Sequence, residues 1–235
     1  MSSDSNFISR RPRLRSHFAA RHASRSFGYV LLAIGVTFVF AATAPDANWS
    51  TSTLVLLESG TMIVALWTSG LAKAGSLLNI GFLCLAVGLA TADLIWGGAT
   101  LTGVLGIVSA LLAAAIVGVI AGSVIIQGEI NAQSVSGAIC VYLLLGIIFM
   151  YVYGAIAALG NDGFFSSGTD GTRSLRLYFS YITLATVGYG DYTANSNLGH
   201  TVSIVEALLG QIYLVTVVAL LVARVGPGRR RAQEE

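Results

Sequence analysis

The chain has 235 residues, of which 55% are hydrophobic and only 10% are charged, and its mean hydropathy is +0.78. Soluble domains carry roughly 25% charged residues, so the composition excludes a water-soluble protein and indicates a polytopic membrane protein. The formal net charge of +2 says little about partners, and we expect no nucleic-acid partner.

Apolar segments of membrane-spanning length recur along the chain. A span needs about 20 consecutive apolar residues. Six segments approach this length, at residues 27–44, 51–70, 75–94, 99–126, 137–159 and 200–225. A polar stretch rich in glycine and serine separates the last two. We therefore predict an all-α membrane protein with six transmembrane helices.

The basic residues support this count, because Lys and Arg collect on the cytoplasmic flanks of short loops. Six spans place eleven of the thirteen basic residues on that side: Arg10, Arg11, Arg13, Arg15, Arg21, Arg25, Lys73, Arg224, Arg229, Arg230 and Arg231. Only Arg173 and Arg176 lie on the opposite side. Both termini are thus predicted to be cytoplasmic.

Two alternatives concern the N-terminal part of the chain. The first apolar segment also resembles a cleaved signal peptide, since Ala42-Thr43-Ala44 is a small-residue site. Its apolar run is longer than usual, and the five remaining spans would contradict the charge rule in either orientation. The basic arm at residues 1–26 is interpreted as a topology anchor, with contact to anionic lipid as the alternative.

The polar stretch before the last span contains the pattern T-x-x-T-x-G-Y-G-D, from Thr183 to Asp191. This pattern resembles the selectivity filter of the potassium channel family, in which backbone carbonyls replace the water around a dehydrated ion. The resemblance implies that K⁺ is bound by the carbonyls of Thr186, Val187, Gly188 and Tyr189. It covers residues 137–225 strongly and the earlier spans only by their arrangement.

Physical reasons can be given for the residue types in this pattern. Successive carbonyls can face an ion only where the backbone leaves ordinary strand geometry, and glycine reaches positive φ at little cost. Gly188 and Gly190 are therefore expected to be needed as glycines. The Thr186 hydroxyl would add a ligand at the inner mouth, Tyr189 would pack behind the filter, and Asp191 would lie at the outer mouth.

Residues 174–185 have the length and aromatic content of a short re-entrant pore helix, whose C-terminal dipole favours a cation. Relatives often carry tryptophans here to support the filter, whereas this chain has Tyr178 and Phe179. That departure leaves selectivity intact but puts slow inactivation in doubt. Since one filter strand cannot encircle an ion, four copies are needed. We expect a homotetramer, with a heteromer as the alternative.

The last span carries a candidate hinge and cavity face. Gly210 lies nineteen residues after Asp191, where relatives have a hinge glycine. The alternative role of Gly210 is close helix packing. Leu214, Val218 and Val222 recur every four residues, so they would line the cavity on one helical face.

The first four spans, residues 27–126, resemble the voltage-sensor module of six-span channels but depart from it in one respect. No Arg or Lys lies between Trp96 and Gln127. Each arginine that crosses the field contributes about 2.3 kcal/mol per 100 mV, so steep voltage dependence is not expected. A cytoplasmic linker is predicted at 127–136, the pore domain at 137–225 and a short tail at 226–235, with no room for a ligand-binding domain.

Three acidic residues lie within or near the apolar segments, namely Glu58, Asp93 and Glu206. Buried carboxylates are costly and indicate function. Glu58 and Asp93 resemble voltage-sensor countercharges that lack arginine partners. Glu206 lies one turn before Gly210, and we expect it to bond Ser180 or Thr183 and to support the filter.

These features predict a potassium-selective channel of a plasma membrane, of bacterial type, with membrane lipid around it. The alternatives are a silent or modulatory subunit and, further away, a potassium-transporter subunit, which would usually carry several pore repeats in one chain. No enzyme motif is found. No cofactor is expected, because K⁺ is the transported ion.

Overall fold

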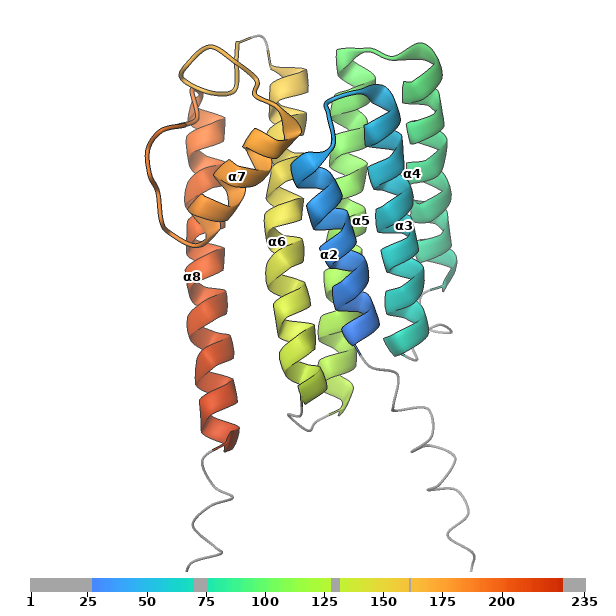
Figure 1. Ribbon diagram of the computed structural model, residues 1–235, viewed down its shortest axis with the longest axis vertical. Helices are drawn as coiled ribbons and strands as arrows, with labels where there is room; N and C mark the ends of the chain where they lie inside the picture. The colour runs from blue at the N-terminus through green and yellow to red at the C-terminus, as the bar shows by residue number, and fades with distance from the viewer. Residues whose placement is uncertain (1–26, 70–75, 128–131, 161, 226–235) are drawn as a thin grey trace, which may run out of the picture.

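The computed structural model describes residues 27–69, 76–127, 132–160 and 162–225. The basic arm at 1–26, Lys73 and the tail at 226–235 lie outside the described residues. The described part is all-α, and its helices are α2 (Gly28–Thr43), α3 (Asn48–Ser69), α4 (Ser76–Trp96), α5 (Ala99–Gln127), α6 (Ala132–Leu159), α7 (Arg173–Leu184) and α8 (Asn197–Val225) (Figure 1).

Six of these helices coincide with the six apolar segments, and the short α7 coincides with the predicted pore helix. The predicted linker at 127–136 stays a prediction, since residues 128–131 lie outside the described residues, and α6 begins within its second half, at Ala132. Residues 132–136 have low hydropathy, but Ala and Gln favour a helix. Similarly, α8 begins at Asn197, three residues before the predicted span.

By length and composition, four helices of the described part can cross a membrane, namely α3, α5, α6 and α8. Helix α2 is apolar, but its 16 residues rise only about 24 Å at 1.5 Å per residue. The hydrocarbon core is about 30 Å thick. In α4 the described apolar part is Leu83–Trp96. The crossing of all six helices therefore stays a prediction.

Helices α2 to α5 form a four-helix unit that packs against the α6 and α7 helices of the same chain. The main contact joins α5 to α6. Glycines allow this close approach: a Cβ at Gly106 would lie 3.3 Å from the Tyr151 carbonyl oxygen. Small residues at such contacts let membrane helices approach each other closely. This contact fixes the four-helix unit to the segment that carries α7.

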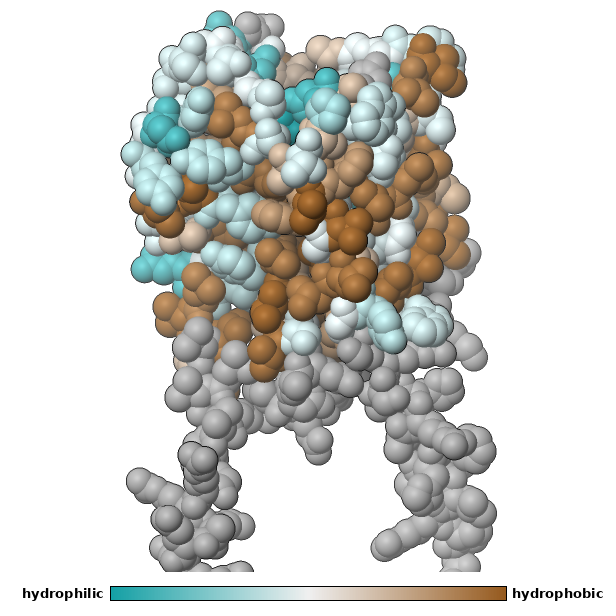
Figure 2. All heavy atoms as spheres, in the orientation of Figure 1, coloured by the Kyte–Doolittle hydropathy of each residue, from teal (hydrophilic) through white to brown (hydrophobic). Residues whose placement is uncertain are grey.

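Figure 2 shows how hydropathy is distributed over one face of the molecule. Hydrophobic residues gather across the middle of this face, over the parallel helices, while hydrophilic residues gather at its upper end. The upper end carries the connections on both sides of α7 (Figure 1). This distribution fits a chain whose middle lies in lipid.

Helix α8 is set apart from the other membrane-crossing helices by its low burial. Only 11% of its apolar window is buried within the chain, against 44–50% for α3, α5 and α6. It contacts α6 and α7 and leaves the rest of its surface exposed. This face includes Ile204, Leu208, Ile212 and Val215. A single chain thus leaves a long apolar helix face without cover.

Candidate functional site

Helix α7 is held at both ends by specific contacts. It begins where the Thr172 hydroxyl accepts a hydrogen bond from the Leu175 N–H at 3.1 Å, an N-cap that satisfies a free backbone donor. Near its other end, Tyr181 donates to the Leu143 carbonyl of α6 at 2.6 Å. Its ring lies where a Cβ of Gly146 would be, 2.5 Å from the nearest ring carbon. Gly146 therefore permits the docking of α7 on α6.

The backbone after α7 has an alternating conformation. Thr186, Gly188 and Gly190 have positive φ values of 54°, 55° and 78°. Thr186 is the one non-glycine residue with positive φ in the described part of the chain. Sequence reasoning identified the two glycines but missed Thr186, because threonine rarely adopts this conformation.

The first three N–H groups of this segment, those of Thr186, Val187 and Gly188, point back toward α7. Thr186 N–H donates to the Thr183 carbonyl at 2.9 Å, and the N–H groups of Val187 and Gly188 both donate to the Ile182 carbonyl, at 2.8 and 3.2 Å. Alternating left- and right-handed residues gather successive N–H groups on one side. In a trans peptide the C=O group points opposite to the N–H group, so the carbonyls of Ala185, Thr186 and Val187 lie on the other side, away from α7.

Residues 185 to 191 are all exposed in the single chain. Tyr189 is 71% exposed, so the expected packing behind the filter is not made within its own chain. Tyr192, by contrast, packs against aromatic rings of its own chain. Its ring centroid lies 5.5 Å from that of Phe165 and 6.5 Å from that of Tyr178.

The two aromatic residues in the middle of α7, Tyr178 and Phe179, have different partners. The Tyr178 hydroxyl donates to Asp191 Oδ2 at 2.8 Å, joining α7 to the outer end of the motif. This hydrogen bond raises the pKa of the Tyr178 phenol to about 12, so it remains a donor at neutral pH. Phe179 is buried and packs edge-on against Tyr153 and Phe165, with ring centroids 5.1 and 5.4 Å apart.

Glu206 of α8 is completely buried and joins three helices. Its carboxylate accepts hydrogen bonds from the Ser180 hydroxyl of α7 and the Tyr153 hydroxyl of α6, each at 2.5 Å. Of the two partners expected for Glu206, Ser180 is present in this role. Sequence reasoning missed Tyr153, whose only signal was a polar tip inside an apolar span.

Gly210 lies where α8 meets the end of α7. A Cβ at this position would collide with the carbonyl oxygen of Leu184. Close packing accounts for the glycine, and its role as a hinge stays a prediction. Leu214 is exposed on α8, whereas the side chains of Val218 and Val222 lie outside the described residues.

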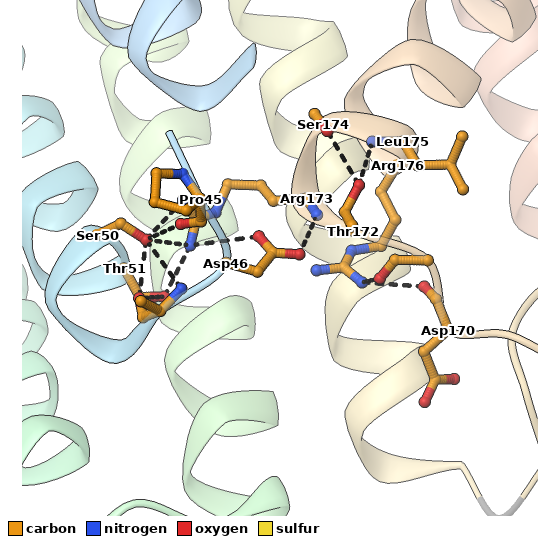
Figure 3. A network of polar contacts seen from close by, with 12 residues as sticks. Pro45, Asp46, Ser50, Thr51, Asp170, Thr172, Arg173, Ser174, Leu175 and Arg176 are labelled. Carbon is orange, nitrogen blue, oxygen red and sulfur yellow. Dashed lines mark hydrogen bonds and ion pairs between the residues drawn. The ribbon is translucent and has the colours of Figure 1, made fainter. Parts of the chain in front are cut away.

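The outer end of α7 is tied to the four-helix unit by a polar network (Figure 3). Asp46 accepts a hydrogen bond from the Arg173 N–H at 2.8 Å and approaches the guanidinium at 3.9 Å. The guanidinium also donates to the hydroxyls of Ser50 and Thr51. Sequence reasoning gave Asp46 no role, because it stands alone in a short connection.

The two remaining acids differ from each other. Asp93 Oδ1 accepts a hydrogen bond from the Thr102 hydroxyl at 2.9 Å, which joins the ends of α4 and α5. Glu58 is 1% exposed, and neither of its oxygens has a hydrogen-bond partner among the described residues. Among the described residues, neither Asp93 nor Glu58 forms an ion pair with an arginine.

Comparison with protein families finds a match for one segment of the chain. Residues 137–226 match the family model described as an ion channel, and this segment comprises α6, α7, α8 and the motif between them. This part of the chain is therefore similar to an ion channel domain, and we call it the channel domain. No curated protein and no solved structure matches the chain. The channel domain begins at the α6 segment, and the four-helix unit precedes it.

Proposed function

We propose that this chain is the subunit of a homotetrameric, potassium-selective channel. Its filter is formed by the backbone carbonyls of Thr186, Val187, Gly188 and Tyr189, with Asp191 at the outer mouth. K⁺ passes down its electrochemical gradient as cargo and no organic cofactor takes part. The setting is a plasma membrane of bacterial type.

The observation that carries this proposal is the alternating backbone of the filter segment. Positive φ occurs at Thr186, Gly188 and Gly190. The N–H groups of residues 186 to 188 bond to carbonyls of α7, so the carbonyls of the same peptides lie on the exposed side, and we infer that the row continues to Tyr189. A row of carbonyls is the ligand set that replaces the hydration shell of K⁺. Helix α7 ends at Leu184 beside this row, so its C-terminal dipole favours a cation nearby.

Two features support four copies of the chain around one pore. One row of carbonyls leaves most of an ion uncoordinated, so several rows must converge. Helix α8 and the filter segment are also the parts of the channel domain that the single chain leaves uncovered. Packing of copies through these surfaces would bury the apolar face of α8 and place Tyr189 against a neighbouring subunit.

Absence of steep voltage dependence is part of the proposal. Helix α5 occupies the place of a voltage-sensing helix, and its sequence from Ala99 to Gln127 contains no Arg or Lys. Without gating charge on α5, a change of potential does little work on its position. The four-helix unit would then serve as a rigid support for α6 and α7.

Ion flux into liposomes tests the proposal. Purified chain in K⁺-loaded liposomes is expected to carry K⁺ flux and to exclude Na⁺. Gly188→Ala should abolish this selectivity, because φ is +55° at Gly188 and alanine is strained there. Gly118→Ala is the matched control, since a Cβ at Gly118 meets nothing within 4 Å and its φ is helical.

Three outcomes would contradict the proposal. Equal K⁺ and Na⁺ flux would argue against a selective filter. Absence of flux from a folded tetramer, with flux restored by a partner protein, would favour a modulatory subunit. Equal loss of selectivity in Gly188→Ala and Gly118→Ala would mean that the backbone conformation at Gly188 does not determine K⁺ selectivity.

A further inference from the structure

The two arginines on the outer side are a feature that the conduction pathway does not use. Arg173 and Arg176 begin α7, and Arg173 is only 7% exposed. Charged side chains buried in membrane proteins are costly and are retained where they are paired or bind something. The partners of these two residues are therefore informative.

The two guanidinium groups are unequally satisfied. Arg173 is paired with Asp46 at 3.9 Å, the only ion pair within the part of the chain that the structure describes. Arg176 has no such carboxylate: its Nη1 donates to the backbone carbonyls of Asp170 and Gly171 at 2.9 and 2.7 Å. Its Nε is buried and has no hydrogen-bond partner among the described residues. Arg176 is thus left without a direct ion pair, and the carboxylates of Asp46 and Asp170 act on it only at longer range.

Both arginines line a cavity of about 70 Å³ between α3, α5, α6 and α7. Each water needs about 10–15 Å³ of such space, so the cavity holds more than one water-sized group. Its polar lining consists of Thr51, Thr102, Ser109, Tyr151, Arg173 and Arg176. None of the described residues that line it carries a carboxylate.

The unsatisfied polar groups of the cavity can all donate a hydrogen bond, and Arg176 Nε–H can only donate. Ser109 is completely buried, and its hydroxyl has no partner in the described structure. The Tyr151 hydroxyl also has no partner there, but it lies near Glu58 as well as the cavity. Gly154 faces Arg176, where a Cβ would lie 3.4 Å from Nε. A side chain there would crowd the free edge of the guanidinium.

We propose that this cavity binds one small monovalent anion of chloride size, held by Arg173, Arg176 and Ser109. The ligand must accept hydrogen bonds, because the free Arg176 Nε–H can only donate and the Ser109 hydroxyl can donate as well. It must be small, because of the cavity volume, and carry no more than one negative charge, because only one guanidinium lacks a direct ion pair. The inference is independent of potassium selectivity, since it concerns the opposite end of α7.

Anion binding would act on the whole of α7. Its first turn would be joined through the anion to α5 and α6, while the carbonyls of its last turn hold the filter N–H groups. Occupancy of the cavity is therefore expected to stabilise the folded channel. Chloride should raise the midpoint of thermal unfolding above that in gluconate, which is too large to enter.

Bromide gives the direct test, because its anomalous X-ray scattering locates it. Crystals of the full chain grown in KBr are expected to show one bromide between the two guanidinium groups and Ser109 in each subunit. An empty cavity, water alone or the phosphate of a lipid at this position would overturn the proposal.

Thermal unfolding tests the roles of the residues. At constant ionic strength, Ser109→Ala should raise the chloride concentration for half-maximal stabilisation about tenfold, the effect of losing one hydrogen bond to an ion. Ser174→Ala, on α7 but outside the cavity, should leave it unchanged. Arg176→Gln should abolish chloride stabilisation, and Arg176→Lys should retain part of it through the charge.

The outcomes separate binding from folding and from conduction. Equal shifts in Ser109→Ala and Ser174→Ala, or full chloride stabilisation in Arg176→Gln, would overturn the site. If Arg176→Gln does not fold, Ser109→Ala still decides. The readout requires no ion flux, so failure of potassium selectivity would leave this result unaffected.

Discussion

Two buried glutamates in different units of the chain are satisfied in different ways. Glu206 in the channel domain accepts hydrogen bonds from Tyr153 and Ser180. Glu58 in the four-helix unit has no hydrogen-bond partner among the described residues, and its surroundings include Ile116, Leu144 and Ile147. Both residues are buried, with Glu206 0% exposed and Glu58 1% exposed.

The difference shows where the chain organises its polar groups. Leaving a buried polar group unpaired costs free energy, whereas pairing it fixes the elements that carry its partners. Glu206 joins α6, α7 and α8 next to the proposed filter, so its hydrogen bonds fix the helices that carry that segment. Within the part of the chain that the structure describes, no hydrogen bond joins the Glu58 side chain to another element. The Tyr151 hydroxyl acts on it electrostatically but does not reach hydrogen-bond geometry.

The largest expected difference between the two units is in how much stability changes when a helix glycine is replaced by alanine. Gly210→Ala would drive a methyl group into the Leu184 carbonyl and should destabilise the protein by about 1–3 kcal/mol or more. Gly118→Ala in the four-helix unit meets no atom within 4 Å and should stabilise α5 by about 0.5–1 kcal/mol. Chemical unfolding of both variants measures this, and similar effects would remove the distinction.

The second largest change in stability is expected from substitution of Glu206. Glu206→Ala leaves the Tyr153 and Ser180 hydroxyls without their acceptor, at a cost of about 1–3 kcal/mol for each buried group. Glu206→Gln keeps an acceptor oxygen and should lose less. The measurement pairs thermal unfolding with the K⁺ to Na⁺ flux ratio. If Glu206→Gln leaves conductance, selectivity and inactivation unchanged, its carboxylate has no part in filter support.

A smaller effect of opposite sign is expected at Glu58. Glu58→Leu replaces an unpaired carboxyl by an apolar side chain of similar volume, which is neutral or stabilising by about 1 kcal/mol or more. The same unfolding assay measures it. A loss of stability as large as that in Glu206→Ala would mean that Glu58 is paired in the assembled channel, and the contrast between the two acids would disappear.

The smallest expected effect is that of membrane potential. Open probability should change little over 100 mV, because an arginine crossing the field would add about 2.3 kcal/mol and α5 has none. Single-channel recording across voltage measures the gating charge. A value of several elementary charges would place a voltage sensor elsewhere in the four-helix unit.

Most helix positions were predictable because apolar residues mark them. The second half of the linker was not, since Ala132 to Ser136 are too polar to resemble a span and yet continue α6. At the filter, Gly188 and Gly190 were predictable from backbone requirements, but Thr186 was not. Its positive φ depends on N–H bonds to Thr183 and Ile182, which form only when α7 ends beside it.

The sequence by itself determined the class of chain, the helices and the filter motif, because composition, apolar length and a contiguous pattern are local properties. The tertiary structure alone decided which distant groups meet. Tyr153 reaches Glu206 across 53 residues, and Arg173 reaches Asp46 across 127. Such pairs have no periodicity or spacing to read along the chain. They exist because helix packing brings their donors and acceptors within hydrogen-bond distance.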